Sequence, residues 1–132
     1  MIAAALINLL RTDGALTALV GSDPMRVGPQ RGEQGEKTPY VTYRVLSDTA
    51  DYCKGNSAHT ERAVVVFSCY DVSSLNAHAV ATQLRRALHD KSGAHGGVHI
   101  RHLRYLSKED QYADTAQLFG VNIEFEVKYN YT

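Results

Sequence analysis

Residues 119–131 alternate strictly between apolar and polar side chains, and this pattern constrains the fold more than any other feature of the chain. The apolar series is Phe119, Val121, Ile123, Phe125, Val127, Tyr129 and Tyr131, and the polar series is Gly120, Asn122, Glu124, Glu126, Lys128 and Asn130. Because successive side chains of a strand point to opposite faces, the pattern predicts a strand with one buried and one solvated face. The chain must therefore build a sheet whose apolar face is covered by other elements.

Helices that could provide this cover are predicted in two main segments. Apolar residues at helical spacing predict a helix over residues 2–11 and a longer one over residues 72–90. A short helical turn is predicted over residues 15–21, closed by Gly21. In the longer segment one apolar stripe holds Ala77, Val80, Ala81, Leu84, Ala87 and Leu88.

The remaining segments read as strands and polar connections. Strand patterns cover residues 39–46, 61–71 and 98–107, with a short one at 25–27. Polar or glycine-rich stretches at 28–37, 48–60, 92–97 and 108–115 are typical of loops and turns. The order of elements predicts a single α+β domain over residues 1–132, in which a largely antiparallel sheet packs against an N-terminal helix and one long central helix.

The composition argues against several classes of protein. The 132 residues are 44% hydrophobic and 21% charged, which favours a folded core and argues against disorder. Lys plus Arg and Asp plus Glu both number 14, whereas a dedicated nucleic-acid binder normally has a basic excess. The sequence has neither an apolar run of the roughly 20 residues that cross a bilayer nor a signal-peptide pattern, and it has only two cysteines. We therefore expect reduced, cytoplasmic synthesis and no membrane partner.

The histidines His95, His99 and His102 raise the possibility of a metal site. Such a site needs three or four ligands that converge on one ion. On a regular strand, His99 and His102 point to opposite faces and cannot share an ion unless a bulge intervenes. Polar surface histidines are the preferred interpretation, and we expect neither a metal nor a cofactor. A small cytoplasmic metal-binding enzyme that uses residues 95–102 is the alternative from a different functional class.

Signals for catalysis and for nucleic-acid binding are weak. The sequence contains neither Gly-x-Ser-x-Gly nor Ser-x-x-Lys. The carboxylate pairs Glu109–Asp110 and Glu124/Glu126 are more typical of solvated positions. The basic and aromatic residues 101–105 fit an ordinary exposed strand better than a nucleic-acid site. Two polar loops and eight tyrosines remain, and tyrosine is a residue that interfaces favour. We therefore expect a protein that makes contacts and is not an enzyme.

The order of motifs resembles the tail-completion proteins of long-tailed bacteriophages, also called tail terminators or head-to-tail joining proteins. The matching segments are residues 13–21, 39–43, 61–70, 77–88 and 118–129, with Tyr112 before the closing strand. The two loops at 28–38 and 48–60 match no pattern of that family. The resemblance spans nearly the whole chain through order, spacing and length.

This resemblance implies a structural virion protein at the head–tail interface, made in the cytoplasm of the bacterial host. It implies a ring of identical subunits, typically a hexamer, that caps the tail tube and joins it to the head-side connector or stopper protein. DNA would pass through the lumen without specific binding, and neither catalytic residues nor cofactors are implied. Another neck or tail component, such as a head-side adaptor or a tail-tube relative, is the alternative within this class.

Two groups of residues are the candidate contact sites. For the ring interface we expect the polar side of the closing strand, namely Glu124, Glu126 and Lys128. For docking to the tube and connector we expect the two long polar loops, represented by Arg31, Glu33, Glu36, Lys37, Asp48, Asp51 and Lys54. Both assignments are hypotheses about heterologous contacts, in which two different patches of each subunit must match.

Overall fold

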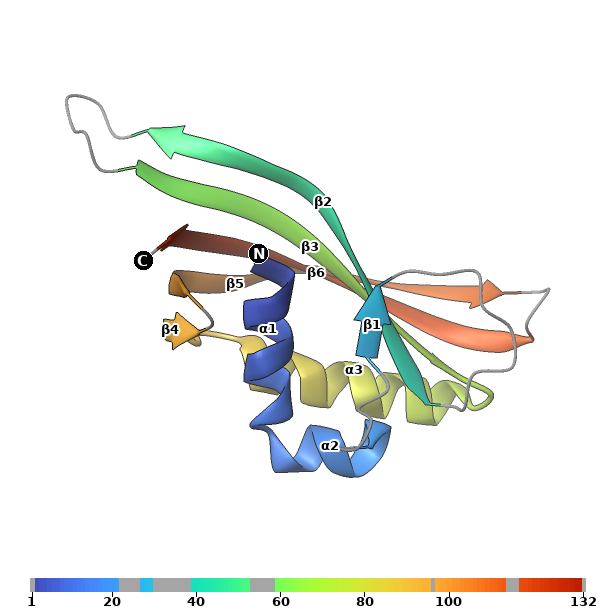
Figure 1. Ribbon diagram of the computed structural model, residues 1–132. Coiled ribbons are helices and arrows are strands. Elements are labelled where there is room, and N and C mark those ends of the chain that lie inside the picture. The colour runs from blue at the N-terminus through green and yellow to red at the C-terminus, as the bar shows by residue number, and fades with distance from the viewer. Residues whose placement is uncertain are drawn as a thin grey trace.

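The computed structural model of this chain describes residues 2–21, 27–29, 39–52, 59–95, 97–113 and 117–131. Its elements follow the order shown in Figure 1. The helices are α1 (Ile2–Arg11), α2 (Gly14–Val20) and α3 (Ser74–Leu88). The strands are β1 (Val27–Pro29), β2 (Tyr40–Tyr52), β3 (His59–Asp71), β4 (Gly93–His95), β5 (Val98–Ala113) and β6 (Leu118–Tyr131).

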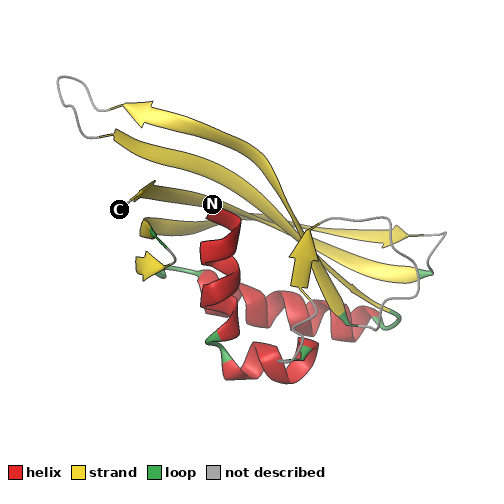
Figure 2. Ribbon diagram, in the orientation of Figure 1, coloured by secondary structure: helices red, strands yellow, loops and turns green. Residues whose placement is uncertain are grey.

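The strands form one sheet of six in the order β1-β2-β3-β6-β5-β4. Every neighbouring pair is antiparallel except β1 and β2, which are parallel. The closing strand β6 therefore lies inside the sheet, between β3 and β5. Figure 2 shows the helices gathered on one side of this sheet. The predicted α+β architecture, with an N-terminal and a long central helix on a largely antiparallel sheet, is confirmed.

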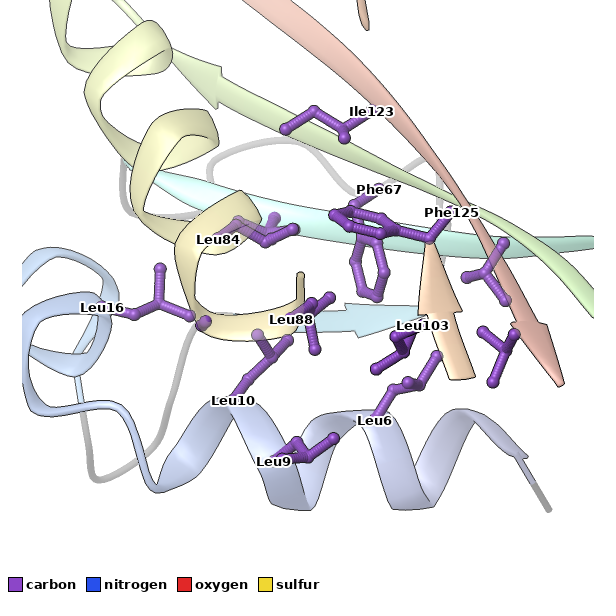
Figure 3. Close-up of a cluster of buried hydrophobic side chains, with 14 of the residues drawn as sticks. Leu6, Leu9, Leu10, Leu16, Phe67, Leu84, Leu88, Leu103, Ile123 and Phe125 are labelled. Atoms are coloured by element: carbon purple, nitrogen blue, oxygen red, sulfur yellow. The ribbon is translucent and has the colours of Figure 1, made fainter. Parts of the chain in front are cut away.

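The core lies between the sheet and the helices (Figure 3). All six residues of the predicted α3 stripe are buried. They meet the apolar side of β6, where Ile123 and Phe125 are fully enclosed, and the leucines of α1 such as Leu6 and Leu10. The rings of Phe67 and Phe125 meet edge to face with centroids 6.1 Å apart. Apolar and polar residues therefore alternate in β6 because one face of the strand is buried, as the sequence predicts.

The N-terminal helices are tied to α3 by a polar contact. Asp13 is the N-cap of α2, and its Oδ1 accepts a hydrogen bond from the backbone N–H of Leu16 at 2.9 Å. The same Oδ1 accepts a hydrogen bond from Nε2 of Gln83 on α3 at 3.2 Å. One carboxylate therefore caps a helix and links it to the next layer.

Several boundaries differ from the sequence prediction, among them residues 28–29, which belong to β1 and were expected in a loop, and the end of α3 at Leu88, two residues earlier than expected. Residues 48–52 and 59–60 belong to the β2–β3 hairpin and residues 108–113 to β5, although all were expected in loops or turns. The short strand β4 occupies part of the expected break at 92–97. The helix α3 begins at Ser74, two residues later than expected. The polar strand ends lack an apolar pattern because strand pairing satisfies their backbone groups without a buried face.

Candidate interaction surfaces

One face of the sheet is covered by the helices, and no described helix or strand covers the other, which we call the open face (Figure 2). The polar series of β6 lies on it. In register, Asn122 lies opposite Ser68, Glu126 opposite Val64 and Lys128 opposite Arg62. The three predicted interface residues Glu124, Glu126 and Lys128 thus share one surface, as the alternation requires.

These three residues differ in exposure. Glu124 and Lys128 are half-buried, whereas Glu126 is only 6% exposed because β6 is a central strand. Oε2 of Glu126 forms an ion pair with Nη2 of Arg62 at 2.7 Å. The Arg62 side chain itself is 51% exposed. The role of Glu126 in a subunit contact stays a prediction, and Arg62 is the member of the pair that a neighbour would reach.

The open face carries a shallow groove of about 300 Å³. Its lining includes Arg44, Ser68, Gln111, Asn122 and Glu124. Asn122 Oδ1 accepts hydrogen bonds from the Ser68 hydroxyl at 2.6 Å and from Gln111 Nε2 at 3.1 Å. Because these groups bind one another, the floor of the groove is a satisfied polar network, which favours a fixed surface over a reactive site.

Most predicted docking residues fall outside the described parts of the chain. These are Arg31, Glu33, Glu36, Lys37 and Lys54. Asp51 lies in β2, but its side chain is not described. Asp48 also lies in β2, and both of its carboxylate oxygens accept a hydrogen bond from the Tyr129 hydroxyl at 2.8 Å. The loop placement predicted for Asp48 is therefore wrong, and its proposed docking role stays untested.

An exposed apolar patch lies where β3 leads into α3 and beside the end of the β5–β6 hairpin. We call it the apolar tip, and it consists of Val72, Leu75, Tyr112 and Phe119. Leu75 is 82% exposed and Val72 is 65% exposed. The rings of Tyr112 and Phe119 stack with centroids 5.0 Å apart beside a hollow of about 330 Å³. This patch was not predicted from the sequence. One signal was present, because Leu75 lies outside the apolar stripe of α3, and a position outside such a stripe indicates exposure.

One carboxylate lies near the apolar tip on each face of the sheet. Asp110 Oδ1 lies 3.3 Å from Nε2 of His78, the latter on the first turns of α3. The neighbouring Glu109 lies on the open face opposite Asn122. The tip is therefore an apolar and aromatic surface with an acidic margin.

The histidines are arranged differently from the prediction. The register of β5 against β6 shifts between Ile100 and His102, which leaves Arg101 as an extra residue. His99 then lies opposite Asn130 and His102 opposite Lys128, both on the open face. The expectation of opposite faces was wrong because a bulge reverses the alternation. Within the described ranges, no group of three His, Cys, Asp or Glu side chains could hold a metal ion.

Cys69 is the buried thiol of β3 and belongs to the core. Desolvation by burial raises its pKa from 9.0 to about 12, so the thiol stays protonated at neutral pH. A nucleophilic or metal-binding role would require the thiolate. In the described part of the chain, no helix is long and apolar enough to cross a membrane.

Comparison with known proteins gives a family and a fold. Residues 4–130 match the family model of the tail completion protein gp17. Among solved structures, a chain from the virion of a native gene transfer agent particle is similar, with a TM-score of 0.75 and 19% sequence identity. The similarity covers 96% of this chain and 92% of that chain. A search of curated proteins gives no match.

The family match covers almost all of the described sheet and helices, including both the open face and the apolar tip. The resemblance stated from the sequence is thereby confirmed at the level of the family. This chain belongs to the tail completion protein gp17 family.

Proposed function

We propose that this tail completion protein is a tail terminator, a subunit of a ring that caps the tail tube and joins it to the head-side connector. The observation that carries the proposal is the family match over residues 4–130. The described surface supports it, because the polar side chains of the open-face groove bind one another and the residues of the apolar tip are exposed, as suits a protein that binds other proteins. The proposed working state is a hexameric ring within the virion, with no catalytic step.

DNA passage through the ring is part of the proposal. Its support is the formal net charge of zero at pH 7. A strongly basic lumen would hold the phosphate backbone through release of counterions, which would oppose ejection. A neutral subunit allows passage without specific binding.

The contact residues are proposed in two sets. Glu124 and Lys128, with the Arg62–Glu126 ion pair between them, form the polar surface proposed for subunit contacts. The residues proposed for axial docking to the tail tube and to the connector are Arg31, Glu33, Glu36, Lys37, Asp48, Asp51 and Lys54. Burial of Glu126 makes a charge reversal at that position a test of folding, so Glu124→Lys and Lys128→Glu are the appropriate reversals.

The test is to produce particles from a genome in which the gene for this protein has been deleted. We expect such particles to yield separate heads and tails, and purified protein added to the tails to restore joining. Antibody labelling should place the protein at the head-proximal end of isolated tails. Label on heads alone would instead identify a head-side adaptor, and normal joining without the protein would refute the proposal.

The loop assignment has its own test. Deletion of residues 30–36 should leave folding and ring mass unchanged while it blocks joining. Normal virion yield from that deletion would exclude this segment as the docking site.

A further inference from the structure

The apolar tip and a cluster of basic side chains lie at opposite ends of the same sheet. The cluster, which we call the basic patch, consists of Arg62 on β3, Arg101 and Arg104 on β5 and Lys128 on β6. Asp110 at the tip lies opposite Val121, whereas Ile100 beside the patch lies opposite Tyr129. These eight steps along β6 separate the two surfaces by about 25 Å, at roughly 3.3 Å per residue.

Arginines carry the accessible positive charge of the basic patch. Glu126, which lies beside the patch, is 6% exposed and is paired with Arg62 at 2.7 Å. Arg101 and Arg104 are exposed, and His99 and His102 add polar rings on the same face. The patch therefore presents the positive charges of Arg101 and Arg104 to an approaching surface.

The side chains of the patch are partly held in place. Arg101 Nε donates a hydrogen bond to Asn130 Oδ1 at 2.7 Å. The guanidinium of Arg62 is held by Glu126. Fixed arginines lose less side-chain entropy when they bind a partner, which favours their use in an interface.

The tip offers the complementary chemistry. Tyr112 is 48% exposed and Phe119 is 41% exposed, so their rings are accessible to a guanidinium group. Asp110 lies on the same face of the sheet as these rings, and Glu109 lies on the opposite, open face, so this end of the sheet carries one exposed carboxylate on each face. The chain already uses this kind of contact internally, because the Arg85 guanidinium lies 3.9 Å from the centre of the Tyr105 ring.

We propose that the apolar tip of one copy, with Glu109 and Asp110, docks on the basic patch of the next copy. The two surfaces are different and lie too far apart to meet within one chain, so their contact is heterologous and head-to-tail. Such a contact closes a ring when the rotation between copies allows it. This inference rests on the proposed ring and names its subunit contact.

Charge reversal in matched pairs tests the contact. The acidic-side variant is Glu109→Lys with Asp110→Lys, and the basic-side variant is Arg101→Glu with Arg104→Glu. Each variant should raise the subunit concentration needed for assembly by about tenfold or more, because like charges then face each other. A mixture of the two variants, or a chain with all four substitutions, should recover assembly because opposite charges face each other again. Native mass spectrometry and light scattering measure the mass at each concentration.

The control is Arg11→Glu with Arg86→Glu, two exposed positions outside both surfaces that give the same change in charge as the basic-side variant. This variant should assemble as the wild type does. Leu75→Ser, which removes apolar area without a change in charge, should weaken assembly on its own. Circular dichroism melts on every variant separate lost assembly from lost folding.

The outcomes distinguish this contact from the ring itself. If the wild type assembles and every charge variant assembles equally well, the head-to-tail contact is wrong and the ring proposal stands. If the wild type forms no ring on isolated tails, both proposals fail together. If the basic-side variant assembles normally but loses retention of a duplex DNA fragment that the wild type binds, the patch is a nucleic-acid site and the inference is overturned.

Discussion

The hydroxyl of Tyr129 donates a hydrogen bond that both carboxylate oxygens of Asp48 accept at 2.8 Å, across 81 residues of sequence. The ring of Tyr129 is fully buried at the end of the core, and Asp48 lies on β2, two strands away. The side chain of Tyr129 thereby reaches across the intervening strand β3, where the residue between the two strands is the small Ala63. The contact fixes the outer part of the β2–β3 hairpin to the central strand.

Tyr129→Phe should destabilise the fold by about 1–2 kcal/mol, since hydrogen bonds to charged groups contribute about that much or slightly more. The ring would keep its packing, so the loss should come from the hydroxyl alone. Chemical denaturation followed by circular dichroism measures the change. The control is Tyr43→Phe, because the Tyr43 hydroxyl has no hydrogen-bond partner in the described ranges. Equal effects from both variants would show that the Asp48 contact contributes little.

Strict alternation predicted β6 and its buried side because the two faces of that strand meet different surroundings. The prediction fails at Phe119, which continues the apolar series and is nevertheless 41% exposed. The cover provided by the helices ends near the start of α3, beside which Phe119 lies. A sequence pattern records which side of a strand is apolar, but it does not record where the covering layer stops.

The candidate site was predictable in part. Alternation placed Glu124, Glu126 and Lys128 on one face, and the register bears this out. It did not foresee that Glu126 would be enclosed, because neighbouring strands supply the side chains around it. The bulge at Arg101 adds one residue to β5 without any pattern in the sequence, and it moves His102 to the face of His99.

Gly120 lies where any larger residue would collide with the polar network of the open face. A Cβ at this position would lie 2.9 Å from Gln111 Cγ and 2.9 Å from Tyr70 Cε1. These two side chains share a hydrogen bond of 2.9 Å from Gln111 Nε2 to the Tyr70 hydroxyl. Gly120→Ala should therefore cost about 1–3 kcal/mol of stability, as overpacked substitutions do. Thermal unfolding measures this cost.

Gly14→Ala is the matched control for Gly120→Ala. A Cβ at Gly14 would meet nothing within 4 Å, and the residue begins α2. The substitution should stabilise the fold by about 0.4–1 kcal/mol, because alanine restricts the unfolded chain. A destabilised Gly14→Ala would contradict the open surroundings of this residue, and an unchanged Gly120→Ala would show that the open face adapts.

The contributions of Arg62 and Glu126 to the stability of the fold should be coupled. Arg62→Met leaves the carboxylate of Glu126 nearly enclosed without its ion-pair partner, and we expect a loss of about 1–3 kcal/mol. The double variant Arg62→Met/Glu126→Leu should recover most of this loss, because apolar replacement of both partners removes the desolvation penalty. Denaturation of both single variants and the double variant gives the coupling energy.

Arg44→Met is the control for the pair, because Arg44 lies on the same face and has no ion pair within the described ranges. It should change stability by less than about 0.5 kcal/mol, as an ordinary surface substitution does. Additive effects of Arg62→Met and Glu126→Leu in the double variant would contradict the coupling.

Cys69 should make stability fall in alkaline solution. Burial raises the pKa of its thiol from 9.0 to about 12, so between these values the folded protein keeps the proton and the unfolded chain loses it. The contribution is therefore fully present below pH 9 and is lost as the pH rises toward 12, with a slope of at most about 1.4 kcal/mol per pH unit. Tyrosines and lysines also titrate in this range. Cys69→Ala measured in parallel therefore isolates the contribution of the thiol, and the stability of this variant should fall less steeply.

Thiol labelling tests the same burial independently. In a Cys53→Ser background, Cys69 is the remaining thiol, and it should react with a disulfide reagent only as fast as the protein unfolds. Rapid labelling of the folded protein at pH 8, or identical alkaline profiles for the wild type and Cys69→Ala, would contradict the buried thiol.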